Sequence, residues 1–314
     1  MQTLAICDGK FELTAFQVRD EYLEHGTRYQ KFCCPECKVP LEAKCIYGEH
    51  FKKIAHFALP KDTQHNAPCP PKGKERRDAA ASRLKFVHGL DVDLPAKLIE
   101  ARPPRVPPSR PLTDEDIPAS GEFLNARQGA ARVVDNQPAT TMLQVVVEAW
   151  TVARKACYKS APPLKGGAPN HKWVADKLKL YPLALYGKAS NYDQAFHKFT
   201  SLWRGAVIHY GYNRVELTTD GFSVHATPSI SVWRDTKGEA LTIPLEYPGI
   251  VVVRLEPAGS SRLRDRVHAQ LSGAAHSGKA VRWFAFGEME FDEANRCYAV
   301  HVDSCRHIYI DTEL

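Results

Sequence analysis

The first quarter of the chain contains a cysteine knuckle in which two residues separate Cys34 from Cys37. This spacing lets both sulfur atoms face one point, as a tetrahedral zinc ion requires of half of its ligands. A closed structural site needs two more nitrogen or sulfur ligands, and His56 and Cys69 follow in the sequence, with His65 as an alternative for one position. We therefore predict a structural zinc ion bound by Cys34, Cys37, His56 and Cys69.

The distribution of the nine cysteines supports this prediction. Six lie within the first 69 residues, namely Cys7, Cys33, Cys34, Cys37, Cys45 and Cys69. The chain begins without the basic segment and apolar core of a signal peptide, so we expect a cytoplasmic protein whose thiols stay reduced. Ligands and buried thiols then explain the cysteines better than disulfides do. We expect Cys33 and Cys45 to neighbour the zinc site rather than to bind the metal.

Several short segments around the knuckle resemble a known family. They are Cys-Pro-Glu-Cys at 34–37, Leu-Glu-Ala-Lys at 41–44, Ile-Ala-His-Phe-Ala at 54–58, and Cys69. Together they resemble the zinc-ribbon-like region of the competence protein CoiA-like family, over roughly residues 1–80. The chain departs from the family pattern at Leu59, where a second histidine would stand, which leaves the fourth ligand to Cys69 or His65.

The resemblance also implies a biological setting. Related zinc-ribbon proteins occur on bacterial integrative and conjugative elements, and a nuclease-like domain often follows the zinc region in the CoiA-like family. A restriction-type nuclease core needs clustered acids and a Glu-x-Lys motif that holds metal and water. Glu42-Ala43-Lys44 has these letters, but it lies between the predicted zinc ligands, so we interpret it as solvated surface.

A second constellation could supply a thiol nucleophile near the carboxyl terminus. Cys305 and His307 are two residues apart, with Asp303 close by, so a strand would place all three on one face. A packed strand explains the same pattern more simply. We predict no catalytic residue, and we lean away from an enzyme.

The elements that would position these residues fall into three parts. Residues 1–92 are predicted to form a zinc-ribbon module of short strands, including 4–6 and 11–16, with a following helix near 72–90. Residues 93–140 contain eight prolines and predict an extended linker. Residues 141–314 predict an α+β domain with a mostly antiparallel sheet and a few helices.

Within this last part, residues 141–154 fit either a helix or a strand followed by a helix. Residues 191–203 read as an amphipathic helix and 262–271 as another helix. Strands are predicted at 206–210, 214–217, 222–226, 230–233, 250–255, 281–286, 298–302 and 307–310.

The middle of the chain is strongly basic. Residues 142–216 contain eleven Lys and Arg and four acidic residues, whereas the whole chain carries a formal net charge of +6. Aromatic residues are interspersed among these cations: Trp173, Tyr181, Tyr186, Tyr192, Trp203, Tyr210 and Tyr212. Cations neutralise phosphates and flat rings stack on unpaired bases, so the pattern favours single-stranded nucleic acid. The predicted contact residues are Lys172, Lys179, Tyr186, Lys188, Arg204 and Arg214.

We therefore predict a zinc-containing nucleic-acid-binding protein of a bacterial mobile element or defence system. Two alternatives remain: a diverged nuclease of the CoiA-like family, and a non-enzymatic adaptor for protein partners. No stretch approaches the ~18 consecutive apolar residues of a membrane-spanning helix, so no membrane partner is expected.

Overall fold

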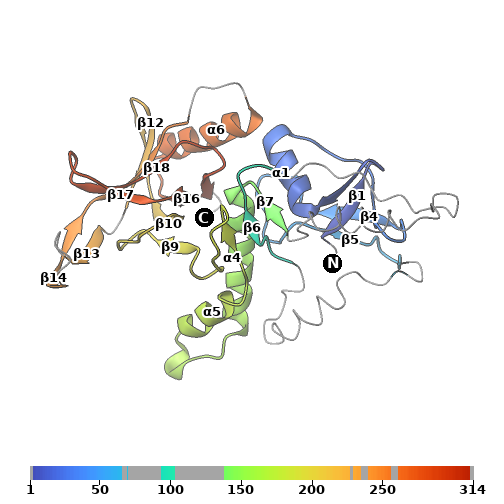
Figure 1. The fold of residues 1–314 in the computed structure, drawn as a ribbon, viewed down its shortest axis with the longest axis horizontal. Coiled ribbons are helices and arrows are strands. Elements are labelled where there is room, and N and C mark those ends of the chain that lie inside the picture. The colour runs from blue at the N-terminus through green and yellow to red at the C-terminus, as the bar shows by residue number, and fades with distance from the viewer. Residues whose placement is uncertain are drawn as a thin grey trace, which may run out of the picture.

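The computed structural model describes residues 3–65, 69, 93–102, 138–226, 229–234, 240–255 and 261–311. Within these ranges the chain has the predicted α+β architecture, with sheets that are mostly antiparallel (Figure 1). The helix predicted near 72–90 and residues 103–137 of the predicted linker lie outside the described residues.

A five-stranded antiparallel sheet forms the amino-terminal part, in the order β2-β1-β3-β4-β5. Its strands are β1 (Leu4–Cys7), β2 (Phe11–Thr14), β3 (Phe32–Cys33), β4 (Pro40–Lys44) and β5 (His56–Ala58). The predicted strand at 11–16 ends early, because helix α1 (Ala15–His25) begins at Ala15. Our interpretation of this part as strands and turns alone was therefore wrong.

Helix α1 begins and ends with standard caps. The Thr14 hydroxyl accepts a hydrogen bond from the Gln17 backbone N–H, and the Gln17 side chain accepts one from the Thr14 N–H. This reciprocal pair satisfies two amides at the helix start. Gly26 ends the helix in a left-handed conformation with φ of 73°, which glycine adopts without steric cost.

A small parallel sheet anchors both ends of the predicted linker. It contains β6 (Lys97–Leu98), β7 (Ala139–Thr140) and β8 (Ala184–Leu185), in the order β7-β6-β8. The chain therefore enters and leaves the linker region at neighbouring strands.

Helix α4 (Leu143–Ser160) runs from the centre of the molecule outward. Every residue from 143 to 150 is buried, so the first two turns have no polar face. Helical periodicity is invisible in such a segment, which is why the sequence left helix and strand open. Beyond the sheets, α4 continues through a short 3-10 helix (Lys165–Gly167) into α5 (His171–Leu178), and this α4–α5 hairpin projects from the body (Figure 1).

The carboxyl-terminal part contains two larger sheets, a hairpin and one long helix. The four-stranded sheet has the order β19-β16-β10-β9 and the five-stranded sheet the order β11-β12-β15-β18-β17. Their strands are β9 (Phe196–Lys198), β10 (Val207–Asn213), β11 (Val215–Thr218), β12 (Gly221–His225), β15 (Gly249–Val253), β16 (Val281–Gly287), β17 (Met289–Asp292), β18 (Cys297–Val302) and β19 (Ile308–Asp311). Strands β13 (Ile230–Arg234) and β14 (Ala240–Tyr247) form the hairpin, and α6 spans Arg262–Ser277.

All eight strands predicted for this part exist, whereas the helix predicted at 191–203 does not. The Asn191 side chain accepts hydrogen bonds from the backbone N–H groups of Asp193 and Gln194, which closes a single turn. Phe196 then starts β9, which pairs in parallel with β10, and its ring stacks on Trp150 at 4.4 Å. Tertiary pairing and ring packing therefore override the helical periodicity.

One buried ion pair connects the amino-terminal part to α4. The Arg19 and Glu148 side chains are 1% and 8% exposed, and Arg19 Nη2 lies 2.6 Å from Glu148 Oε1. Arg19 also donates to the backbone carbonyl of Ile46 at 2.9 Å, and its guanidinium lies over the Phe51 ring. The Gln144 side-chain amide donates to Glu148 from one turn earlier in α4.

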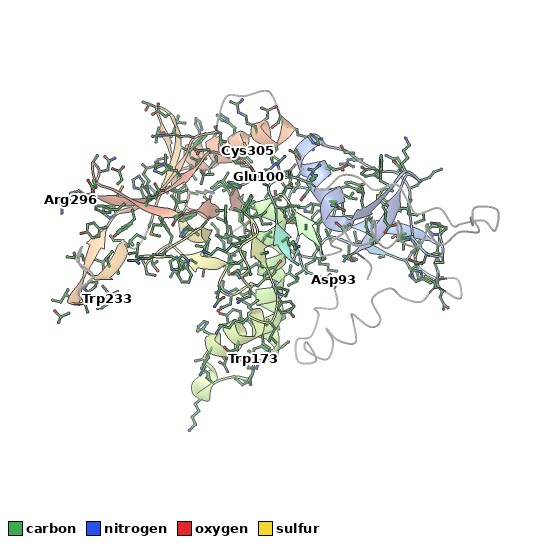
Figure 2. The ribbon with its side chains drawn as sticks, viewed as in Figure 1. Asp93, Glu100, Trp173, Trp233, Arg296 and Cys305 are labelled. Atoms are coloured by element: carbon green, nitrogen blue, oxygen red, sulfur yellow. The ribbon has the colours of Figure 1, made fainter. Side chains whose placement is uncertain are left out.

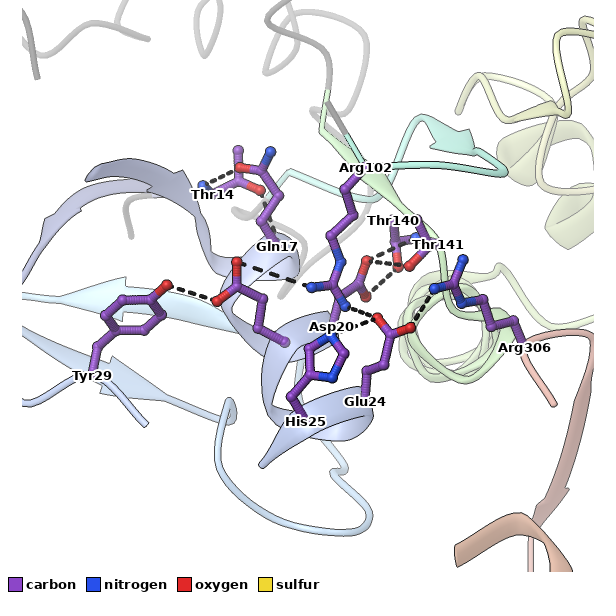
Figure 3. A network of polar contacts seen from close by, with 11 residues as sticks. Thr14, Gln17, Asp20, Glu24, His25, Tyr29, Arg102, Thr140, Thr141 and Arg306 are labelled. Atoms are coloured by element: carbon purple, nitrogen blue, oxygen red, sulfur yellow. Dashed lines mark hydrogen bonds and ion pairs between the residues drawn. The ribbon is translucent and has the colours of Figure 1, made fainter. Parts of the chain in front are cut away.

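A second polar network also involves helix α1 (Figure 3). The Asp20 carboxylate accepts hydrogen bonds from the Thr140 hydroxyl at 2.6 Å and the Thr141 backbone N–H at 2.7 Å. Glu24 pairs with Arg102 and with Arg306, which precedes β19. Helix α1 is therefore fastened to the linker ends and to the carboxyl-terminal part at once.

Replacing Glu148 by Ala should lower the free energy of unfolding by roughly 3–5 kcal/mol, because Arg19 would keep a buried charge without its partner. Urea denaturation of the full chain measures this change. The matched control is Glu42→Ala, which breaks the exposed Lys44–Glu42 pair and should cost at most about 1 kcal/mol. Equal losses in the two variants would contradict the structural role of the Arg19–Glu148 pair.

Burial raises the pKa of Asp20 from 3.8 to about 6, although its hydrogen bonds with Thr140 and Thr141 act in the opposite direction. A raised folded-state pKa means that this contribution to stability is present at low pH and is lost as the pH rises through about 6. The stability of the wild type relative to Asp20→Asn should therefore fall between about pH 3.8 and about pH 6, the interval between the ordinary and the raised pKa of this carboxyl group. Melting curves at several pH values test this, and a constant difference would contradict it.

Candidate functional site

Four nitrogen and sulfur donors converge beside the amino-terminal sheet. Cys34, Cys37, His65 and Cys69 place one ligand atom each within 4.8 Å of one another. Cys34 Sγ lies 3.9 Å from Cys69 Sγ, and Cys37 Sγ lies 3.2 Å from His65 Nδ1. A three-cysteine, one-histidine group could hold a metal ion in tetrahedral coordination.

The local fold explains how the knuckle presents its sulfur atoms. The turn between β3 and β4 is closed by hydrogen bonds from Cys34 N–H to the Val39 carbonyl and from Lys38 N–H to the Cys34 carbonyl. Lys38 adopts a positive φ of 61°, which reverses the chain directly after Cys37. His65 and Cys69 reach the same point from the segment after β5.

The structure places His56 outside this group and brings in His65, the alternative considered from the sequence. His56 begins β5, is buried, and its Nδ1 lies 2.8 Å from the Ile54 carbonyl. The fourth donor is therefore His65, and the predicted ligand set is corrected at this one position. Sequence spacing could not separate the two histidines, because both lie between the knuckle and Cys69.

Electrostatics in the group are those expected of clustered thiols. Desolvation, followed by contacts with the thiols of Cys37 and Cys34, raises the pKa of Cys69 to about 12. A bound cation would reverse this effect and favour the thiolates. Cys33 and Cys45 are not part of the group, as predicted, and burial raises the pKa of both thiols.

The predicted nucleic-acid contacts do not form one cluster. Lys172 and Lys179 lie on α5 or at its end, are exposed, and belong to the projecting α4–α5 hairpin. The Lys188 ammonium lies next to Gly205, 2.9 Å from the point where a Cβ at that position would stand, so it is close to the loop before β10 that carries Arg204. Arg214 is exposed between β10 and β11.

Tyr186 is used within the fold. Tyr186 and Gly187 form the tight turn after β8, with φ values of 49° and 82°. The Tyr186 ring packs on Phe286 at 4.8 Å, and its hydroxyl lies 2.5 Å from His307 Nε2. These contacts favour a structural role over base stacking.

The other aromatic residues of the basic segment divide between core and surface. Tyr181 and Tyr192 are buried, whereas Trp203 and Tyr212 are exposed. Trp173 is partly buried on α5, at the outer end of the molecule (Figure 2), where the Lys177 ammonium lies 5.3 Å from its ring centre. Only part of the predicted aromatic set is therefore available to a ligand.

The two motifs considered for catalysis, Glu42-Ala43-Lys44 and Cys305 with His307, make contacts within the fold. Glu42 and Lys44 pair with each other on exposed positions of β4. Burial raises the pKa of the Cys305 thiol, and His307 contacts Tyr186. Within the part of the chain that the structure describes, no second group of three or more His, Cys, Asp and Glu donors is placed to share a metal ion.

No protein-family model matches this chain, and no curated protein matches it in a sequence comparison. Among the described helices, none combines the length and apolar character that crossing a membrane requires.

The corrected ligand set makes a direct prediction. His65→Ala should lower the metal content of the purified protein, because it removes one of four donors. His56→Ala should leave the metal content unchanged and lower thermal stability, because His56 is a buried residue of β5. Elemental analysis beside melting curves separates the two effects. Metal loss in His56→Ala, with full occupancy in His65→Ala, would restore the sequence-based ligand set.

Proposed function

We propose that this protein binds single-stranded nucleic acid through the surface built around α4, and that a structural zinc ion stabilises the part that supports this helix. The observation that supports the proposal most strongly is the charge of the α4–α5 hairpin. Between residues 149 and 180 the chain contains seven Lys and Arg and one acidic residue, Asp176.

The cations of the hairpin are exposed to a degree that suits phosphate contacts. Lys155, Lys159, Lys165, Lys172 and Lys179 are all exposed. Because the hairpin projects from the body, a charged polymer could approach it from several directions (Figure 1). Such a cluster attracts polyanions by neutralising phosphates and releasing their counterions.

The donor set supports zinc as the metal. Three thiolates and one imidazole are soft and borderline ligands, which suit zinc better than magnesium or calcium. Four protein ligands leave no open position for water, so the ion would hold the fold and supply no catalysis. A structural zinc also fits the small size of the segment that contains it.

One observation favours the adaptor as a second candidate. The β13–β14 hairpin extends away from the sheets and carries Trp233 and Ile243, which are 58% and 78% exposed (Figure 2). Exposed apolar patches mark sites of protein–protein contact. This surface would serve a protein partner if the nucleic-acid proposal fails.

The full-length protein should bind a labelled single-stranded oligonucleotide at low salt, and the affinity should fall steeply as salt rises. Reversing four exposed charges of the hairpin, Lys155, Lys159, Lys172 and Lys179, to Glu should weaken binding to all sequences alike. Fluorescence anisotropy measures both effects.

The matched control reverses four exposed lysines of the amino-terminal part instead: Lys10, Lys52, Lys53 and Lys61. It changes the net charge equally and should bind more tightly than the hairpin variant. No binding by the wild type at about 50 mM salt, where phosphate contacts are strong, would contradict the proposed function and favour the adaptor. Equal loss in both variants would show attraction by net charge alone.

A further inference from the structure

A second basic and aromatic surface lies where α4 leaves the four-stranded sheet. It combines Arg154 and Tyr158 of α4, Tyr210 and Tyr212 of β10, and Arg282 of β16. We call these five residues the ledge. They come from three elements far apart in the sequence, and Arg282 lies outside the basic segment 142–216.

Strand register places the sheet residues of the ledge on one face. Tyr212 lies directly opposite Arg282, and Tyr210 lies opposite Phe284. Residues paired in this way project to the same side of a sheet. The Trp150 ring of α4 contacts both Tyr210 and Phe284 on that side, at 5.3 and 6.0 Å between ring centres. Helix α4 therefore covers this face where Trp150 packs on it, whereas Tyr212, further along β10, is exposed.

Two guanidinium groups converge at this point. The Arg154 guanidinium lies 5.0 Å from the Trp150 ring centre, and that of Arg282 lies 5.5 Å from it. The Phe196 ring stacks on the same indole at 4.4 Å and nearly parallel to it. Arg154 also lies 5.4 Å from the Tyr158 ring centre.

The two charges are poorly compensated. Among the described residues, neither Arg154 nor Arg282 makes an ion pair within 4.0 Å or a side-chain hydrogen bond. Burial, and then the charge of Arg154, lowers the pKa of Arg282, while Asp311, its neighbour across the strands, acts in the opposite direction. Two like charges held together in a partly buried position favour a ligand with concentrated negative charge.

The aromatic rings of the ledge suit a ligand that carries a flat ring beside its negative charge. Tyr212 is 56% exposed on the outer part of β10, directly beside Arg282. An aromatic ring on an open sheet face, next to cations, is suited to stack on an unpaired base. Lys198 of β9 is exposed opposite Tyr210 and would extend the positive track.

We propose that the ledge holds one backbone phosphate of a single-stranded nucleic acid between Arg154 and Arg282, with an adjacent base stacked on Tyr212. This inference rests on the proposed function and deepens it. It assigns the α4–α5 hairpin to general attraction of the polymer and the ledge to its positioning. Structural packing of both arginines on Trp150 is the competing explanation.

The test uses the full-length protein and two labelled oligonucleotides, one normal and one with abasic positions throughout. Arg154→Gln and Arg282→Gln should each weaken binding to both by about tenfold, which corresponds to about 1.4 kcal/mol for a lost charge-assisted contact. Tyr212→Ala should weaken binding to the normal oligonucleotide by roughly 5- to 150-fold, and should leave binding to the abasic one unchanged.

Arg254→Gln is the matched control, because Arg254 is exposed and follows β15 on the other sheet. It should bind as the wild type does. Melting curves identify any arginine variant that is unfolded, and in that case Tyr212→Ala decides, since an exposed ring can be removed without loss of the core.

The same measurements distinguish a wrong assignment of the ledge from a wrong proposed function. If the wild type binds and the hairpin variant binds weakly, but Arg154→Gln, Arg282→Gln and Tyr212→Ala bind normally, the ledge is overturned and the proposed function stands. An equal effect of Tyr212→Ala on both oligonucleotides would also overturn base stacking. If the wild type binds neither oligonucleotide, both proposals fall.

Discussion

The buried Arg19–Glu148 pair is the constraint on which the arrangement of the molecule depends. It joins helix α1 of the amino-terminal part to the first turns of α4, and both charges lie out of reach of bulk solvent. Such a pair stabilises only when its partners stay aligned, because either charge alone is costly to bury. The pair therefore fixes the direction of α4 near its first turns. The positions of the α4–α5 hairpin and of the ledge depend on this direction, because both contain residues of α4.

The candidate metal site supports the Arg19–Glu148 pair indirectly, through the chain segment that Arg19 contacts. Arg19 donates to the carbonyl of Ile46 and contacts Phe51, on the chain segment between β4 and β5. The four donors pin the turn before β4 to the segment after β5, so a bound ion would stabilise the strands that flank this segment. The candidate metal site lies in the amino-terminal part, and the basic surface is built around α4. The two are structurally coupled, since the contact between α1 and α4 connects them.

The sequence was informative where local chemistry decides the outcome. Cysteine spacing located the knuckle, and short segments of sequence located eight of the carboxyl-terminal strands, because both signals are contained in a few consecutive residues. Strands β9, β14 and β17 were not predicted. It failed where distant contacts decide. Helix α1 buries Arg19 and Asp20 against partners beyond residue 138, so its inward face looks polar. Phe196 lies in a strand and stacks on Trp150, a residue far away in the sequence. Arg282 lies next to Tyr212 only because of the register between β10 and β16. The choice between His56 and His65 likewise needed the path of the chain after β5.

Photochemical cross-linking would show whether single-stranded nucleic acid binds around α4. The full-length protein is cross-linked to a single-stranded oligonucleotide, and the linked peptides are identified by mass spectrometry. Aromatic side chains in contact with bases are the residues that such cross-links report. We expect linked peptides from α4, α5 and β10, with Tyr212 among the attached residues. Cross-links confined to the β13–β14 hairpin or to residues 3–65 would contradict it, and would move the binding surface away from α4.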